Sequence, residues 1–192
     1  MLEMSPEAIG LADQNGALPI HLAAGQGSRS LAFCRMLIQA NPNSVWIKDS
    51  RSSLPLHHAS QWGNIAVAQY LFNLYPFGIN VANIAGELPI HSAITGLKCR
   101  MDPEDAVSMV EFMLSCKLGA ALDERQGAIL LCQVLSGGYN RSNFDARLRV
   151  TKLLIDAFTD SLFLVDNNGL MPLHILCRDS NSVCVKRLHW RL

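Results

Sequence analysis

Histidine and cysteine are the residues of this chain best suited to chemistry, because both bind zinc and both serve in nucleophilic catalysis. Four histidines share a sequence context: His21, His57, His91 and His174. The six cysteines have irregular spacings and include no Cys-x-x-Cys pair: Cys34, Cys99, Cys116, Cys132, Cys177 and Cys184. A metal centre or a cysteine–histidine pair would therefore have to be assembled by the fold.

The histidine spacing argues against such sites. The four histidines follow one another after 36, 34 and 83 residues, so they hold equivalent places in a repeat. Stacked helices lie about 10 Å apart, whereas zinc ligands lie within about 2.0–2.3 Å of the ion. His174 and Cys177 share one helix face, but two ligands do not complete a site. No third group orients a cysteine–histidine pair, and no Walker-type phosphate loop is present. We therefore predict no catalytic residue, no metal and no cofactor, and interpret the histidines as structural.

Each of these histidines ends a recurring phrase. The phrase reads Leu18-Pro19-Ile20-His21, Leu54-Pro55-Leu56-His57, Leu88-Pro89-Ile90-His91 and Met171-Pro172-Leu173-His174. Proline suits the first position of a helix, since its missing N–H would have no partner there. Asp or Asn stands eight positions before each histidine, and Gly or Ser stands five before, which predicts a tight turn. Apolar periodicity over residues 65–72 and 106–114 predicts longer second helices. Each repeat should contain a finger loop, a short helix and a longer helix.

This template resembles the ankyrin-repeat family, from about Pro6 to Leu188. The family favours Thr-Pro-Leu-His, and here Leu or Met replaces the threonine, which removes a side-chain helix cap usually worth ~0.5–2 kcal/mol. The family's reciprocal threonine–histidine hydrogen bond should be lost with it. The resemblance implies one all-α, helical-hairpin solenoid over residues 1–192, with about five repeats and no true sheet. We place the repeats at about 13–48, 49–82, 83–122, 123–165 and 166–192, with 1–12 as the tail of a preceding repeat.

The fourth repeat departs from the template. Leu130 replaces the proline and Cys132 replaces the histidine, and an insert follows at residues 137–145. The third repeat has an insert at 98–105, in which Asp102-Pro103-Glu104 predicts a helix start. No polar hairpin caps the N-terminal end, which indicates a fragment of a longer protein or an incomplete gene product. We expect a monomer unless this uncapped end associates.

Composition excludes several functions. Sixteen Lys and Arg balance sixteen Asp and Glu, so no global field attracts nucleic acid. The longest apolar stretch, residues 128–135, is far shorter than the roughly 20 residues of a membrane-spanning helix. No signal region precedes the repeats, and the cysteine pattern is typical of free thiols in a reducing compartment. We therefore expect an intracellular protein, cytoplasmic or nuclear, that binds neither nucleic acid nor membrane.

The resemblance also implies where a partner binds, because ligands of the family usually lie across the fingertips and the exposed positions of the first helices. The candidate contacts are Asn15, Gln26, Arg51, His58, Gln61, Trp62, Thr95, Asn167 and Arg178. Arg51, His58 and Trp62 should point to one side and form an aromatic anchor beside polar groups. The alternative is that Trp62 packs on the next repeat. We expect a non-enzymatic protein–protein interaction scaffold, or alternatively the recognition module of a larger enzyme or membrane protein whose activity lies outside this chain.

Overall fold

The computed structural model describes residues 9–26, 30–98, 102–116, 122–136 and 143–178. These residues form helices and loops and contain no strand, as predicted for a helical-hairpin solenoid. The chain divides into two compact units, Met1–Leu118 and Gly119–Leu192, and each is described by itself. The single-solenoid organisation and the repeat boundaries remain predictions.

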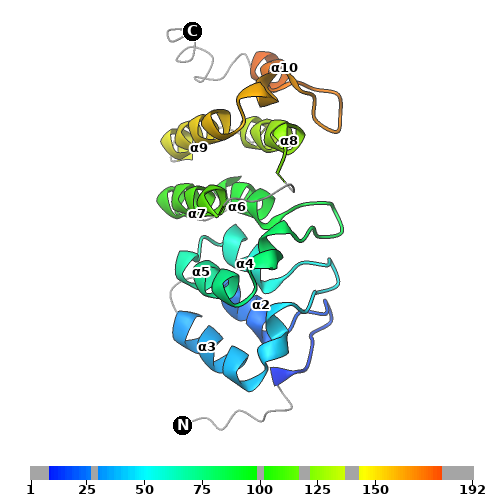
Figure 1. Cartoon of the computed structure of the whole chain (residues 1–192), viewed down its shortest axis with the longest axis vertical. Helices are drawn as coiled ribbons and strands as arrows, with labels where there is room; N and C mark the ends of the chain where they lie inside the picture. The colour runs from blue at the N-terminus through cyan, green and yellow to red at the C-terminus, as the bar shows by residue number, and fades with distance from the viewer. Residues whose placement is uncertain (1–8, 27–29, 99–101, 117–121, 137–142, 179–192) are drawn as a thin grey trace. The chain divides into compact units, whose positions relative to one another are not determined.

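The first unit is built from helix pairs in two layers (Figure 1). The inner helices are α2 (Pro19–Ala24), α4 (Pro55–Gln61) and α6 (Pro89–Lys98), and the outer helices are α3 (Ser30–Ala40), α5 (Ile65–Leu74) and α7 (Pro103–Ser115). Each inner helix begins at the proline of the recurring phrase, where fixed φ and the missing N–H suit a first turn. Buried apolar residues such as Ile20, Leu56 and Ile90 lie in the inner layer and pack the pairs together.

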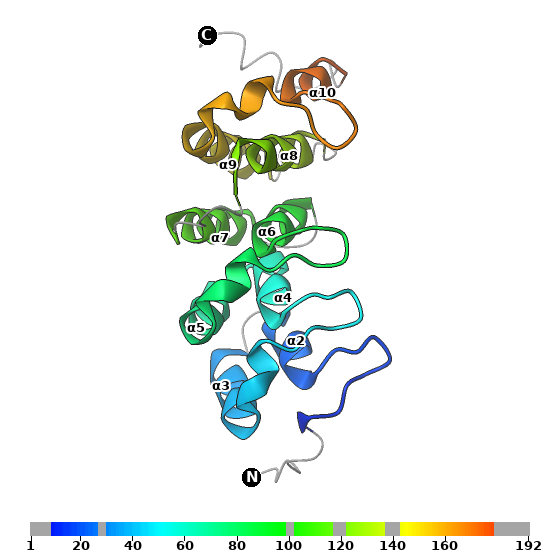
Figure 2. The ribbon, with the colours of Figure 1, turned by 45° about the vertical axis from the view of Figure 1, so that its right-hand side comes forward.

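Two short 3-10 helices connect the first two outer helices to the next repeat: η1 (Pro42–Val45) follows α3, and η2 (Pro76–Asn80) follows α5. Each leads into a finger, the loop that precedes an inner helix. We call residues 10–18 the first finger, 46–54 the second and 81–88 the third. The fingers extend from the same side of the helix pairs (Figure 2).

The predicted turn occurs in every described finger. In the second finger, Oδ1 of Asp49 accepts hydrogen bonds from the backbone N–H groups of Arg51 and Ser53, at 2.9 and 2.8 Å. Asp13, Asn83 and Asp166 accept the equivalent pairs of bonds. In each turn, the residue three positions after the Asp or Asn has positive φ. These residues are Gly16, Ser52, Gly86 and Gly169, with φ of 68°, 58°, 77° and 74°.

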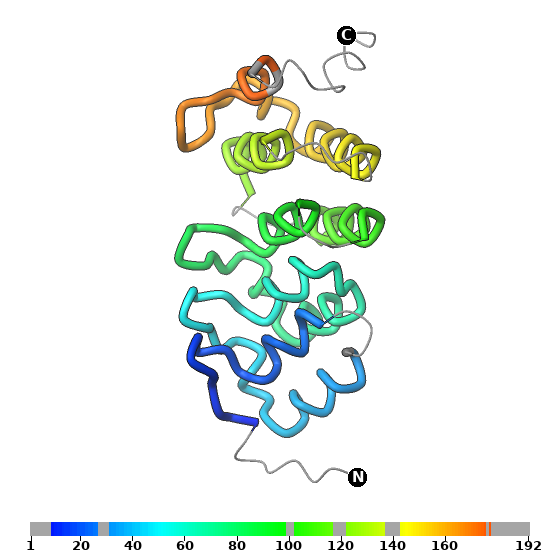
Figure 3. The backbone as a smooth tube through the Cα atoms, turned by 180° about the vertical axis from the view of Figure 1, so that it is seen from behind, coloured from blue at the N-terminus to red at the C-terminus, as the bar shows by residue number. Residues whose placement is uncertain are grey.

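Backbone hydrogen bonds join neighbouring fingers. The N–H of Ser50 donates to the carbonyl of Asn15 at 2.9 Å, and the N–H of Ile84 donates to that of Arg51 at 2.8 Å. These are equivalent positions of successive repeats, so the link follows the same period as the helices. The fingers of this unit therefore lie side by side without strand pairing (Figure 3).

The second unit shows what the degenerate fourth repeat becomes. Its elements are α8 (Glu124–Leu135), α9 (Phe144–Ala157), η5 (Thr159–Phe163) and α10 (Pro172–Arg178). Because Leu130 keeps the N–H that proline lacks, the inner helix extends to Glu124, six residues before the usual start. Asp123 caps it by accepting a hydrogen bond from the N–H of Gln126 at 2.8 Å. Gly127 lets Phe158 pack on this helix, since a Cβ there would lie 2.5 Å from its ring.

The two inserts are described in part. Residues 99–101 and 137–142 lie outside the described residues. In the third repeat, α6 continues to Lys98, and α7 begins at Pro103 with Oδ1 of Asp102 accepting from the N–H of Glu104 at 2.9 Å. The helix start predicted from Asp102-Pro103-Glu104 is therefore confirmed.

Ser52 provides a test of the turn geometry. A left-handed conformation costs a non-glycine residue roughly 1–2 kcal/mol, while glycine adds about 0.5–1 kcal/mol of unfolded-state entropy. Ser52→Gly should therefore raise the free energy of unfolding by about 0.5–1 kcal/mol in urea titration. The reverse change in the third finger, Gly86→Ser, should lower it, because Gly86 has open space around it and only its φ resists a side chain. If both variants changed the free energy of unfolding in the same direction, φ would not be the cause.

Candidate functional site

The histidine of each phrase accepts a backbone hydrogen bond at the N-terminus of its own helix. The backbone N–H of Leu54 donates to Nδ1 of His57 at 3.0 Å, and the same bond, at 3.0–3.1 Å, occurs at His21, His91 and His174. The histidine half of the expected reciprocal bond is therefore retained, since it uses a backbone donor. A leucine side chain cannot supply the other half.

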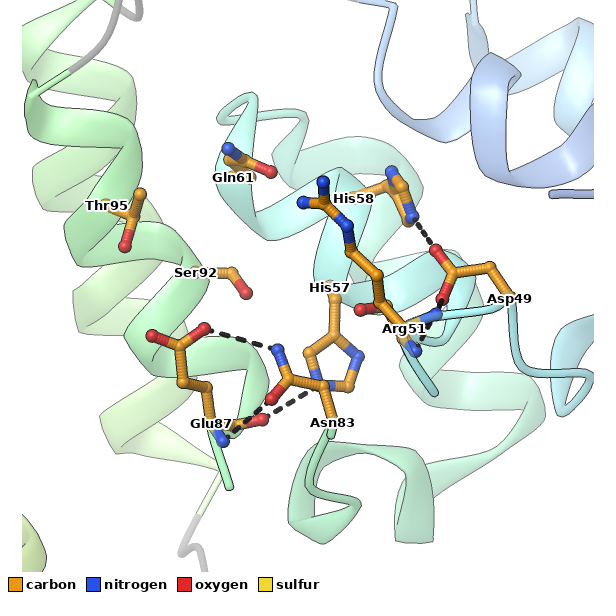
Figure 4. Close-up of a pocket in the computed structure, with 10 residues that line it drawn as sticks. Asp49, Arg51, His57, His58, Gln61, Asn83, Glu87, Ser92 and Thr95 are labelled. Atoms are coloured by element: carbon orange, nitrogen blue, oxygen red, sulfur yellow. Dashed lines mark hydrogen bonds and ion pairs between the residues drawn. The ribbon is translucent and has the colours of Figure 1, made fainter. Parts of the chain in front are cut away.

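The second ring nitrogen reaches the next repeat. Nε2 of His21 lies 3.1 Å from the carbonyl oxygen of Ile47, and Nε2 of His57 lies 3.2 Å from that of Glu87 (Figure 4). Because Nδ1 accepts a hydrogen bond, the proton belongs on Nε2, which donates to these carbonyls. Each ring thus connects its helix to the following finger.

Burial keeps these histidines neutral. His21 is fully buried and His57 is 2% exposed. Burial lowers the pKa of His57 to about 4, and burial together with the charge of His58 lowers the pKa of His21. His174 makes the helix-start bond but is exposed. The geometry of His21 and His57 supports the structural interpretation of these histidines and leaves no basic nitrogen for catalysis.

Cys132 takes over part of the histidine's role in the fourth repeat. Its Sγ lies 3.6 Å from the carbonyl oxygen of Leu170, the residue equivalent to Glu87 in the third finger. Cys132 is 3% exposed, and burial, with a smaller contribution from the charge of Asp166, raises its pKa to about 11. It is a thiol at neutral pH and therefore a weak donor and a poor nucleophile.

A polar groove opens between the second and third repeats of the first unit, with a volume of about 200 Å³ (Figure 4). The second finger and α4 contribute Asp49, Arg51, Ser53, His57, His58 and Gln61, and the third finger and α6 contribute Asn83, Glu87, Ser92 and Thr95. The repeat period places these residues opposite one another, because α4 and α6 pack directly together. Small-molecule sites usually occupy about 300–1,000 Å³, so this groove suits a side chain better than a cofactor.

A hydrogen bond between two side chains orders one wall of the groove. Nε2 of His58 lies 3.0 Å from Oδ2 of Asp49, whose other oxygen holds the finger turn. Burial would raise the pKa of Asp49, but the bonds from His58 and from the backbone lower it overall. The ring of His58 also meets that of His21 edge-on, with centroids 5.5 Å apart. His58 is thus fixed between the finger and the preceding repeat.

The groove brings together four of the predicted contacts: Arg51, His58, Gln61 and Thr95. Trp62 is not among its lining residues. Its side chain is 47% exposed and lies over the end of α2, where a Cβ on Gly25 would be 3.1 Å from the indole. Trp62 therefore packs toward the preceding repeat, whereas the alternative interpretation placed it on the next one.

The remaining predicted contacts lie elsewhere. Asn15 is exposed at the first fingertip, and Gln26 is exposed just after α2. Asn167 is exposed in the finger of the second unit, and Arg178 is the last residue of α10, with a side chain outside those described. None of these four residues lines the groove.

Sequence reasoning missed the carboxylate of Glu87 in the groove. A signal for Glu87 was present, because the equivalent positions hold Ala17, Ser53 and Leu170, none of them charged. In the described part of the chain, no three His, Cys, Asp or Glu residues are placed to hold a metal ion. The groove has neither an activated nucleophile nor a pair of carboxylates free for acid–base work.

Comparison with known families agrees with this arrangement. Residues 1–84 match the family model described as ankyrin repeats (3 copies). The match supports an ankyrin-repeat protein, so the resemblance predicted from the recurring phrase is confirmed over these residues. Ankyrin repeats are generally protein–protein interaction modules, and the family is typically non-catalytic. No curated protein matches the sequence. Within the described residues, no helix has the length and apolar character needed to cross a membrane.

His57→Ala should lower the free energy of unfolding by about 1–3 kcal/mol, because two buried backbone groups lose their partner. The measurement is urea denaturation followed by circular dichroism at pH 7. His174→Ala is the matched control, since its ring makes the same helix-start bond in an exposed position and should cost less. Full retention of stability in His57→Ala would show that this histidine does not hold the repeats together.

Acid should weaken the first unit between about pH 6.5 and 4. The unfolded chain takes up a proton at His57 near pH 6.5, whereas the folded chain resists it down to about pH 4. Stability is therefore complete above pH 6.5 and falls on acidification, by roughly 3 kcal/mol for this residue. Urea titrations across this range should show a shallower pH dependence in His57→Ala. An identical pH dependence in both proteins would contradict the assignment.

Proposed function

We propose that this chain is a non-enzymatic scaffold that binds a protein partner through the fingers and inner helices of its first unit. The observation that carries the proposal is the groove itself. It gathers polar side chains from two repeats, and among the described residues neither the guanidinium of Arg51 nor the amide of Gln61 has a partner. Exposed groups without internal partners are available to a ligand.

The rigidity of the groove supports the same function. Its walls are held by the Asp49 turn, by the His57 bridge to the third finger and by the link between the Arg51 carbonyl and the Ile84 N–H. A partner would therefore find these side chains already positioned, which reduces the entropy lost on binding.

The test begins with affinity capture and mass spectrometry, followed by direct titration of the purified partner. Arg51→Ala combined with Gln61→Ala should weaken binding at least tenfold, about 1.4 kcal/mol, because both side chains are exposed to the groove. The melting temperature should change little, since neither side chain supports the fold. Gln69→Ala on the exposed face of α5 is the matched control. Unchanged affinity in the groove variant, or equal loss in the control, would place the contact surface elsewhere.

A further inference from the structure

The third finger departs from the repeat template at two positions that touch each other. Asn83 stands where the other fingers have Asp13, Asp49 and Asp166, and Glu87 is the single charged residue at its position of the finger. Nδ2 of Asn83 donates to Oε2 of Glu87 at 3.2 Å. An aspartate at position 83 would instead place two carboxylates side by side. The asparagine therefore accommodates a carboxylate that the fold itself does not require.

The backbone of Glu87 is held from two directions. Its N–H donates to Oδ1 of Asn83 at 2.9 Å, and its carbonyl accepts from Nε2 of His57 at 3.2 Å. The side chain is held through Oε2 alone, and Oε1 has no hydrogen-bond partner among the described residues. Glu87 thus presents one carboxylate oxygen to the groove from a fixed position (Figure 4).

Neutral acceptors accompany this carboxylate. Ser92 is 9% exposed, projects from α6 toward the groove, and its hydroxyl makes no bond to any described residue (Figure 4). Thr95, one turn along α6, lines the same groove and donates its own hydroxyl to the carbonyl of His91 at 3.0 Å. Gln61 lines the groove from α4, and its side-chain amide contains an acceptor oxygen as well as an NH2 donor. This set is rich in acceptors.

The charges favour a cation over an anion. Asp49 is already satisfied by His58 and two backbone N–H groups, whereas Glu87 has no ion-pair partner in the described part of the chain. Arg51 is exposed, and its guanidinium lies on the His58 side of the groove, apart from Glu87 (Figure 4). We propose that the groove between α4 and α6 takes an arginine side chain of an extended segment of the protein partner, with Glu87 as its counter-ion and Ser92 and Gln61 as further acceptors.

The inference rests on the proposed interaction function and names the chemistry of its ligand. The five N–H donors of guanidinium suit one carboxylate flanked by several neutral acceptors. A volume of about 200 Å³ accommodates one such side chain. The remainder of the partner segment would then pass over the fingertips, where Arg51 is exposed.

The test uses three capped tripeptides and the isotope-labelled full chain in NMR titrations. Ac-Ala-Arg-Ala-NH2 should shift the amide signals of Glu87, Ser92 and Thr95, and the shifts should diminish with added salt. The citrulline peptide, which has the same shape without the charge, should bind about fivefold more weakly, because the bond to the carboxylate is no longer charge-assisted. Ac-Ala-Glu-Ala-NH2 should bind more weakly still. Tighter binding of the glutamate peptide, or equal binding of the arginine and citrulline peptides, would overturn the inference.

Variants assign the counter-ion. Glu87→Gln retains an oxygen for Asn83 and should weaken the arginine peptide about fivefold, while Asp105→Asn, which makes the same charge change on α7, should not. Gln61→Glu adds a second carboxylate and should tighten binding, which keeps the test decisive if Glu87→Gln folds poorly. Unchanged affinity in both Glu87→Gln and Gln61→Glu would overturn the inference.

The two proposals fail in different ways. If the arginine peptide does not bind but the Arg51→Ala and Gln61→Ala variant still loses the captured partner, the arginine subsite is overturned and the interaction function stands. If the arginine peptide binds at Glu87 but the captured partner is unaffected by that variant, the proposed contact surface is overturned and the subsite stands.

Discussion

The first unit depends on a neutral histidine that bonds in two directions. Nδ1 accepts the last free N–H before an inner helix, and Nε2 donates to the finger of the next repeat, as His57 does at 3.0 and 3.2 Å. Both bonds lie in a buried setting, where an unpaired polar group is costly and a charged ring more so. One side chain thus ends a loop, begins a helix and joins two repeats. The phrase recurs at a near-constant interval in the sequence because each repeat uses the same geometry.

The fourth repeat shows that the two functions of this histidine are separable. The N–H of Ile129, equivalent to that of Leu54, lies inside α8, where the helix itself supplies an acceptor. An Nδ1 acceptor is therefore unnecessary, and only the donor toward the next finger is still needed. Cys132 can provide it through Sγ, at 3.6 Å from the Leu170 carbonyl. Loss of proline and loss of histidine are consequently linked: without Pro the helix extends, and once it extends the ring has one function left.

The sequence was sufficient to predict what repeats. The Asp/Asn turns, the helix starts at proline and the buried positions of His21 and His57 all follow from local chemistry that recurs at a known interval. It was insufficient for features that depend on side-chain packing between repeats. Trp62 carries no signal that distinguishes packing over Gly25 from pointing into the groove. The repeat template also predicts a finger before Leu130 in the fourth repeat, whereas α8 already begins at Glu124. The groove could not be predicted from local sequence, since residues that line it together, such as Gln61 and Ser92, lie 31 residues apart in the chain.

Specificity for a partner in such a chain must come from positions where the repeats differ. Residues that are the same in every repeat already make the hydrogen bonds and packing contacts that stabilise the fold. The fingertip position two residues after each turn Asp or Asn holds Asn15, Arg51, Ala85 and Asn168, and the position two residues further holds Ala17, Ser53, Glu87 and Leu170. Charge appears once in each series, and both charges line the same groove. A chain whose formal net charge is zero can therefore still present a charged site locally. Neighbouring repeats place an arginine and a glutamate at opposite sides of one groove without pairing them, so each is left for a partner to neutralise.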